Sequence, residues 1–274
     1  MTEYHLPPPK LAGGPYVMGV LNVTPDSFSD GGQWEGAAAP HALAMLEAGA
    51  DIIDVGGEST RPGAEPVDEG QEIARVVPVI AALRAASKEA AISIDTMKPA
   101  VAMAAMSAGA TIWNDVNALR WPGALETAAS LPRPVVLMHM LGEPRTMQAD
   151  PRYDDVVAEV IAFLRERVAR VEAKGVTDIW VDPGIGFGKT LAHNLALLNA
   201  TGRIRDEVGR PVMIGASRKS FLAKIDAQAT DARGGRLGGS IAGALLAAQA
   251  GAGMLRVHDV TETVQALKVW KATQ

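Results

Sequence analysis

Short apolar runs alternate along the chain with longer segments of helical periodicity. The runs are continuously apolar, which is typical of strands that are buried on both faces of a parallel sheet. We expect eight such strands, over residues 16–21, 52–55, 91–94, 111–113, 134–138, 179–181, 212–214 and 254–257. The clearest helix spans Asp154 to Lys174, where apolar residues recur every three or four positions and acidic residues precede basic ones.

Eight strands, seven intervening helices and a closing helix from Thr261 to Lys271 form the pattern of a (β/α)8 TIM barrel. We assign residues 16–274 to this single barrel domain and residues 1–15 to an N-terminal extension. A doubly wound sheet is the alternative. It requires a glycine-rich phosphate turn after the first strand, and residues 22–25 read Asn-Val-Thr-Pro instead.

Composition narrows the class of protein. Hydrophobic residues make up 48% of the chain and charged residues 21%, which suits a packed globular core. The net charge of −5 argues against general nucleic-acid binding, and the absence of cysteine excludes disulfides, thiolate zinc sites and a cysteine nucleophile. Residues 1–15 have no apolar core of a signal peptide, and the most apolar stretch, residues 241–250, is too short to span a bilayer. We expect a cytoplasmic protein without a membrane partner.

Polar residues gather where the predicted strands end. In a TIM barrel the carboxyl ends of all strands meet at one rim, and this rim carries the active site. The residues at these ends are rich in amides, carboxylates and cations: Asn22, residues 56–61, Asp95, Asn114, Asp115, His139, Asp182, residues 217–219, Arg256 and His258.

Three of these residues, Asp95, Asn114 and Asp182, suit a flat heterocycle that carries several N–H donors and a carbonyl group. A carboxylate can accept two hydrogen bonds from one amidine-like edge. Each residue alone could equally cap a helix or pair with a lysine. The occurrence of all three at one rim favours a binding site.

Two cationic groups point to an anionic ligand. Residues 217–220 read Ser-Arg-Lys-Ser and begin a helix, where cations oppose the helix dipole unless an anion binds the free backbone N–H groups. The alternative is that Arg218 and Lys219 turn back to acidic side chains. Arg256 and His258 alternate at the last strand, where TIM barrels commonly bind phosphate.

Asn22 ends the first strand and neighbours the last strand once the barrel closes. An amide oxygen, phosphate oxygens and water together can form a Mg2+ shell.

Two long loops, residues 22–32 and 56–63, contain glycine, proline and hydroxyl residues. Such loops can close over a reaction, or they can be ordinary surface turns.

These segments resemble the dihydropteroate synthases, a family of pterin-binding barrels. The motifs that carry the resemblance are residues 18–30, 54–63, 93–96, 114–116, 182–189, 217–222 and 256–258, and it extends from about Tyr16 to Trp270. It implies the condensation of (7,8-dihydropterin-6-yl)methyl diphosphate with 4-aminobenzoate to 7,8-dihydropteroate and diphosphate. It also implies a Mg2+ cofactor, a homodimer that uses the helix at residues 240–250 and the last helix, and inhibition by sulfonamides.

The resemblance also implies roles for individual residues. It places at the pterin Asp95, Asn114, Met138, Asp182, Phe187 and Lys219. It places at the diphosphate Asn22, which also binds the metal, together with Thr60, Arg256 and His258. It places at the 4-aminobenzoate Phe28, Arg61, Pro62, Arg218 and Ser220. The residues implied in catalysis are Lys219, Arg256 and His258.

Two departures from the family pattern follow the fifth strand. Leu141 and Glu143 stand where the family often has Gln and Thr, which affects loop contacts rather than the reaction.

The sequence leaves two other functions open. A methyl-transfer barrel that presents methyltetrahydrofolate to a corrinoid partner would keep the carboxylates but has no use for the two cationic groups. A non-catalytic paralogue would bind a pterin or a partner protein.

Overall fold

The computed structural model describes residues 5–24, 34–59, 65–229, 231 and 235–274. Among the residues with expected roles, Phe28, Thr60, Arg61 and Pro62 lie outside this part of the chain. The described residues contain eight strands: β1 (Tyr16–Asn22), β2 (Ile52–Gly56), β3 (Ala91–Asp95), β4 (Ile112–Asp115), β5 (Val135–Met138), β6 (Ile179–Asp182), β7 (Met213–Ile214) and β8 (Met254–Val257).

The strands form a closed parallel barrel. They hydrogen-bond in the order β6-β5-β4-β3-β2-β1-β8-β7, and every pair is parallel. The ring closes between β6 and β7 through a parallel bridge of Val181 with Val212. The Val181 amide also donates to the Pro211 carbonyl at 3.0 Å. The predicted TIM barrel is therefore confirmed, and the doubly wound alternative is excluded.

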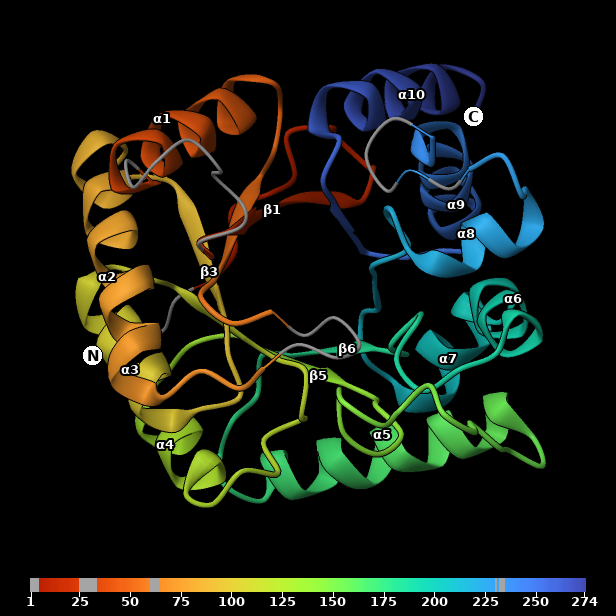
Figure 1. The fold of residues 1–274 in the computed structure, drawn as a ribbon, viewed down its shortest axis with the longest axis horizontal. Coiled ribbons are helices and arrows are strands. Elements are labelled where there is room, and N and C mark those ends of the chain that lie inside the picture. The colour runs from red at the N-terminus through yellow and green to blue at the C-terminus, as the bar shows by residue number, and fades with distance from the viewer. Residues whose placement is uncertain (1–4, 25–33, 60–64, 230, 232–234) are drawn as a thin grey trace.

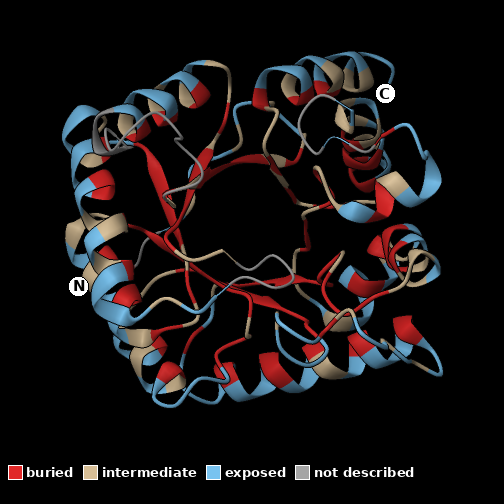
Figure 2. Cartoon of the chain, in the orientation of Figure 1, coloured by how far each residue is buried: buried red, intermediate tan, exposed pale blue. Residues whose placement is uncertain are grey.

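The helices surround the barrel, with buried faces toward the strands and exposed faces outward (Figures 1 and 2). They are α1 (Trp34–Glu47), α2 (Glu69–Ala86), α3 (Pro99–Ala108), α4 (Ala124–Ser130), α5 (Val156–Glu172), α6 (Leu191–Asn199), α7 (Thr201–Val208), α8 (Ser220–Ile225), α9 (Leu237–Gln249) and α10 (Val260–Ala272). Two helices follow β6 and two follow β7, so the prediction of seven intervening helices was wrong. The break after α6 coincides with non-helical Ala200, at φ −87° and ψ 9°.

The barrel interior is filled in layers. Its lower layer is apolar and takes one residue from each strand: Met18, Ile52, Ala91, Ile112, Val136, Trp180, Met213 and Met254. Side chains alternate along a strand, so the residues two positions further on face inward again. This upper layer, which we call the floor of the site, comprises Val20, Asp54, Ser93, Asn114, Met138, Asp182, Gly215 and Arg256. The same alternation that packs the core therefore places polar groups at the rim.

Several strands extend further than the apolar runs indicate. β4 ends at Asp115 and β6 at Asp182, so Asn114, Asp115 and Asp182 lie within strands rather than beyond them, whereas β8 has the predicted bounds. The Asn114 amide donates to Asp54 inside the barrel, whereas Asp115 accepts the backbone amides of Asn117 and Leu119. A hydrophobic pattern cannot detect such positions, because it ends at the first polar residue.

The N-terminal segment covers the opposite end of the barrel. Leu6 packs with Tyr16 against the apolar lower layer, and the Tyr16 hydroxyl donates to the Pro7 carbonyl at 2.8 Å. The Lys10 ammonium donates to the Leu46 and Ala50 carbonyls at 2.8 and 2.7 Å. No helix in the described part of the chain is long and apolar enough to cross a membrane.

Candidate active site

Arg256 bridges the carboxylate of Asp54, in the floor, and that of Asp95, two positions beyond Ser93 in β3. Its Nε donates to Asp54 Oδ2 at 2.6 Å, and its Nη2 donates to Asp95 Oδ2 at 2.7 Å. Asp54 is fully buried and also accepts a hydrogen bond from Asn114 Nδ2 at 3.1 Å. The Arg256 guanidinium, expected at a diphosphate, thus uses two of its five N–H donors to hold the carboxylates in place.

Several buried oxygens in the floor and at Asp95 lack a hydrogen-bond donor. Among the described residues, Asp54 Oδ1, Asp95 Oδ1 and Ser93 Oγ are buried without a hydrogen-bond partner. Leaving such acceptors unsatisfied costs about 1–3 kcal/mol each. Buried polar atoms of native proteins are satisfied by protein, water or ligand, so this floor is suited to a ligand that brings N–H donors.

Asp182 connects the floor with the cations of the rim. Its Oδ1 accepts the Gly184 amide at 2.7 Å. Burial raises the pKa of Asp182, whereas the Gly184 amide, Lys219 and Arg256 oppose this rise. Lys219 and Arg256 therefore act on the same carboxylate, and the cationic and anionic groups predicted from the sequence share one mouth.

An apolar wall lies next to these charges. Phe187 packs in one cluster with Val116, Met138, Met140 and Met147. The Lys219 ammonium lies 3.9 Å from the centroid of the Phe187 ring. The structure thus brings Met138, Phe187 and Lys219 together, so that an apolar wall lies directly beside a cation.

The loop after β6 has glycines where its backbone is left-handed. Gly184, Gly186 and Gly188 have φ values of 70°, 85° and 64°. A Cβ atom at Gly186 would lie 3.1 Å from Lys219 Cδ, so the missing side chain makes room for Lys219. A Cβ atom at Gly184 would lie 1.9 Å from the His139 carbonyl oxygen. The glycines therefore allow the loop to pack against β5 and Lys219.

Replacing Gly184 by alanine should cost about 2 kcal/mol more than replacing Gly175, because overpacking adds to the strain of positive φ. Gly175 is the matched control: its φ is 85°, and a Cβ atom there meets nothing within 4 Å. Urea unfolding of both variants measures the difference. Equal losses in the two variants would contradict the close approach at His139.

Arg218 turns back to an acidic side chain, which is the alternative considered from the sequence. Its guanidinium forms two hydrogen bonds with the Asp259 carboxylate, at 3.1 and 2.5 Å. Arg218 has a left-handed φ of 57°, held by Ser240 Oγ at 2.9 Å and by Arg236, which donates to the Arg218 carbonyl at 3.0 Å. Arg218 thus supports the turn that precedes Lys219.

His258 and Ser220 frame the same turn. The His258 amide and Nδ1 lie 3.2 and 3.1 Å from Ser217 Oγ. Ser220 begins α8 directly after Lys219. Asn22 belongs to the other side of the mouth: a Cβ atom at Gly56 would lie 3.7 Å from both Asn22 Oδ1 and Asp95 Oδ2.

Sequence reasoning missed Asp54 and Lys189. Asp54 interrupts an apolar strand, and a carboxylate in such a run is itself a signal of a polar floor. Lys189 is buried, with Nζ 3.0 Å from His139 Nδ1 and 2.9 Å from the Phe187 carbonyl. Burial lowers the pKa of Lys189 to about 7 and that of His139 to about 3. His139 is therefore a neutral imidazole that fixes Lys189 beneath the loop.

Comparisons with known proteins show the family of this chain. A family model described as pterin binding enzyme matches residues 18–258. The dihydropteroate synthase of Escherichia coli strain K12 is 49% identical over 263 residues, covering 94% of this chain and 92% of the relative.

Two solved structures from Xanthomonas albilineans are also similar. One is a dihydropteroate synthase with 4-aminobenzoic acid, 50% identical with a TM-score of 0.89, and the alignment covers 96% of this chain and 94% of that one. The other is in complex with 7,8-dihydropteroate, 47% identical with a TM-score of 0.85 and the same coverage. Because the family model matches most of its length, the chain belongs to the pterin binding enzymes.

Proposed function

We propose that the chain is a dihydropteroate synthase, a transferase of folate biosynthesis. It joins the methylene carbon of (7,8-dihydropterin-6-yl)methyl diphosphate to the nitrogen of 4-aminobenzoate. The observation that carries the proposal is the shared mouth, where Asp95, Asn114 and Asp182 lie with Lys219 and Arg256. Relatives of this chain carry the same name, and one is solved with the product.

In the reaction the bond between the pterin methylene carbon and the diphosphate oxygen breaks, and diphosphate leaves with the electron pair. Positive charge develops on the methylene and spreads into the electron-rich ring, where Asp95 and Asp182 stabilise it. The aryl amine attacks the methylene carbon and loses one proton to solvent. We assign no general base, because the amine becomes acidic once the new bond forms.

The pterin is oriented by the floor and the wall. The ring's N–H donors meet the unpaired oxygen of Asp95 and the carboxylate of Asp182, and Asn114 offers its amide oxygen. Met138 and Phe187 contact the faces of the ring, and Lys219 lies at its edge beside Phe187.

The diphosphate is assigned to Arg256, His258 and Asn22, together with Thr60. The described residues include no cluster of three or more His, Asp or Glu side chains that could hold a metal. The Asn22 amide oxygen beside Asp95 is one suitable oxygen ligand. This fits a Mg2+ ion that arrives with the diphosphate, since Mg2+ takes few protein ligands and keeps water and phosphate oxygens. The ion would neutralise the charge of the leaving group.

The 4-aminobenzoate is assigned to Phe28, Arg61, Pro62 and Ser220. Because sulfonamides mimic this substrate, they compete for the same position. Arg218 contributes through the turn it stabilises, since its guanidinium is paired with Asp259.

A homodimer and a cytoplasmic location are part of the proposal. Leu246 in α9 and Val269 in α10 are 52% and 65% exposed, which supports a contact between copies through these helices. Light scattering at micromolar concentration tests the dimer, and a monomer would contradict it.

The decisive experiment incubates the purified protein with Mg2+, the pterin diphosphate and 4-aminobenzoate. Formation of dihydropteroate and diphosphate is expected, and it should cease when EDTA removes Mg2+. The competing reading is a methyl-transfer barrel, which has no use for Lys219 and Arg256 around Asp182. Binding of methyltetrahydrofolate without diphosphate release would favour that reading, and pterin binding without any turnover would favour a non-catalytic paralogue.

Pterin affinity should increase as the pH rises through about 7. Burial raises the pKa of Asp95 to about 7, against the effect of Arg256 and with the help of Asp54. The ionised carboxylate binds the ligand's donors, so affinity falls below this pKa. For folding the sign is opposite, because the raised pKa contributes stability at low pH that is lost as pH rises from about 4 to about 7. Calorimetric titrations at several pH values check the affinity, and the dependence should weaken in Asp95→Asn.

A further inference from the structure

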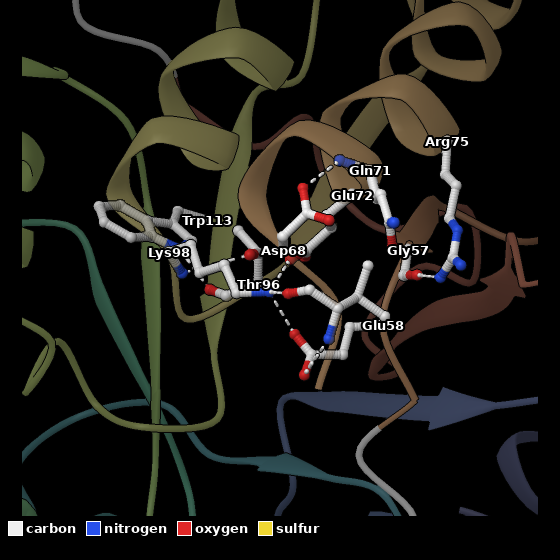
Figure 3. A network of polar contacts seen from close by, with 10 residues as sticks. Gly57, Glu58, Asp68, Gln71, Glu72, Arg75, Thr96, Lys98 and Trp113 are labelled. Carbon is white, nitrogen blue, oxygen red and sulfur yellow. Dashed lines mark hydrogen bonds and ion pairs between the residues drawn. The ribbon is translucent and has the colours of Figure 1, made fainter. Parts of the chain in front are cut away.

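A buried ion cluster lies beside the floor, between α2 and the start of α3 (Figure 3). The Lys98 ammonium donates to Glu58 Oε2 at 2.5 Å, to Glu72 Oε2 at 2.6 Å and to the Val67 carbonyl at 2.5 Å. The side chains of Lys98, Glu58 and Glu72 are 7%, 14% and 1% exposed. All three donors of the ammonium are therefore engaged, and the ammonium fixes the groups around it.

Two of these groups are the ends of one loop. Glu58 follows β2 and Val67 precedes α2, so residues 59–66 run between them. The Val67 amide donates to Glu58 Oε1 at 3.4 Å, and the Gly57 carbonyl accepts from Arg75 Nη1 at 2.8 Å. Lys98 thus joins the two ends of the loop to each other.

Lys98 is also connected to Asp95 and Asn114, two of the residues expected to bind the pterin. Lys98 follows Asp95 by three positions, and its amide donates to Thr96 Oγ1 at 3.2 Å. The Thr96 amide donates to the Asn114 carbonyl at 3.1 Å, and Trp113 Nε1 donates to the Thr96 carbonyl at 2.8 Å. The ends of the loop are thereby tied through Lys98 to β3 and β4.

We propose that Lys98 is a positioning residue that fixes both ends of the β2–α2 loop relative to Asp95 and Asn114. The inference rests on the proposed function, because Thr60, Arg61 and Pro62 are the residues assigned to diphosphate and 4-aminobenzoate. Lys98 acts through Glu58 and Val67. Without the Lys98 charge, the carboxylates of Glu58 and Glu72 would repel each other. Glu58 would then move, because it is the more exposed of the two.

The main test variant is Lys98→Met with Glu72→Met, which removes both charges from the most buried part of the cluster. Of the three charges only that of Glu58 remains, and Glu58 is the most exposed member of the cluster, so we expect the fold to be retained. We expect the KM for 4-aminobenzoate to rise about tenfold and kcat to fall, while affinity for 6-hydroxymethyl-7,8-dihydropterin, which lacks the diphosphate, changes less than about twofold. Hydrogen exchange at the Val67 amide should become faster.

A second variant, Glu58→Gln, keeps the shape and changes only the exposed partner. It should shift the KM for 4-aminobenzoate in the same direction by about threefold, as expected for one weakened charged hydrogen bond. Glu58→Gln also tests the positioning role of Lys98 if the double variant does not fold. The matched control is Lys174→Met, which removes a surface pair with Glu126 at 3.0 Å, where both side chains are at least 44% exposed. This control should match the wild type.

Unchanged 4-aminobenzoate kinetics and unchanged Val67 exchange in both variants would overturn the inference. An equal loss of pterin affinity and 4-aminobenzoate affinity would also overturn it, because that result indicates a general structural role. Failure of the proposed function is distinguishable, since the wild type itself would then give no dihydropteroate while the exchange measurement still reports on the loop ends.

Discussion

An Arg256→Met variant is expected to lose about three orders of magnitude in kcat/KM and about 3 kcal/mol of unfolding free energy. The guanidinium bridges Asp54 and Asp95 inside the barrel, and Asp54 is fully buried. Removing the cation leaves two neighbouring carboxylates uncompensated, so both stability and the geometry of the floor suffer. The same change removes a cation from the position assigned to the leaving diphosphate.

Urea unfolding and steady-state kinetics measure the two losses separately. Arg256→Lys should recover part of the stability but little activity, because an ammonium is a point charge that cannot bridge both carboxylates in the same plane. Arg152→Met provides the control, since that arginine pairs with Asp150 on the surface and is 84% exposed. An Arg256→Met enzyme with wild-type stability would contradict the bridging role.

An Asp95→Asn variant should bind the pterin about a hundredfold more weakly and keep its fold, which is the scale of one lost charged hydrogen bond pair. Asp95 Oδ1 is buried without a partner, and this is the oxygen available to a ligand. An asparagine oxygen can still accept the hydrogen bond from Arg256, so the neighbouring contacts persist. The amide nitrogen, however, presents donors to a ligand edge that also consists of donors.

Fluorescence or calorimetric titration with a pterin measures the affinity, and circular dichroism checks the fold. Ser107→Ala is a suitable control because its hydroxyl donates only to the Met103 carbonyl within an exposed part of α3. Unchanged pterin affinity in Asp95→Asn would remove Asp95 from the binding site.

The hydrophobic pattern predicted the barrel because each parallel strand is buried on both faces. Such a strand is a continuous apolar run, which the sequence shows whichever strands lie next to it. The pattern placed the end of β4 too early, at Trp113 instead of Asp115, whereas the bounds of β8 were predicted correctly. Asn114 and Arg256 face inward, and their polar groups pair with Asp54 and Asp95, which belong to other strands. Burial by a partner distant in the chain leaves no local trace.

Contacts with distant segments also give Arg218 and Lys219 different partners. The two residues are adjacent cations at the start of one helix, and from the sequence each could face an anionic ligand or an acidic side chain. In the folded protein Arg218 pairs with Asp259, while Lys219 lies over Phe187 and acts on Asp182. The left-handed backbone at Arg218 turns the two side chains in different directions.

For this protein, the order of strands and helices, the residue types at the rim and the family resemblance were determined by sequence alone, because periodicity and short motifs are local properties. Only the tertiary structure decided that Arg256 pairs with Asp54. The same holds for the contacts of Lys98 with Glu58 and with the Val67 carbonyl. These are contacts between distant segments, and their energies depend on burial and distance, which exist only once the barrel has closed.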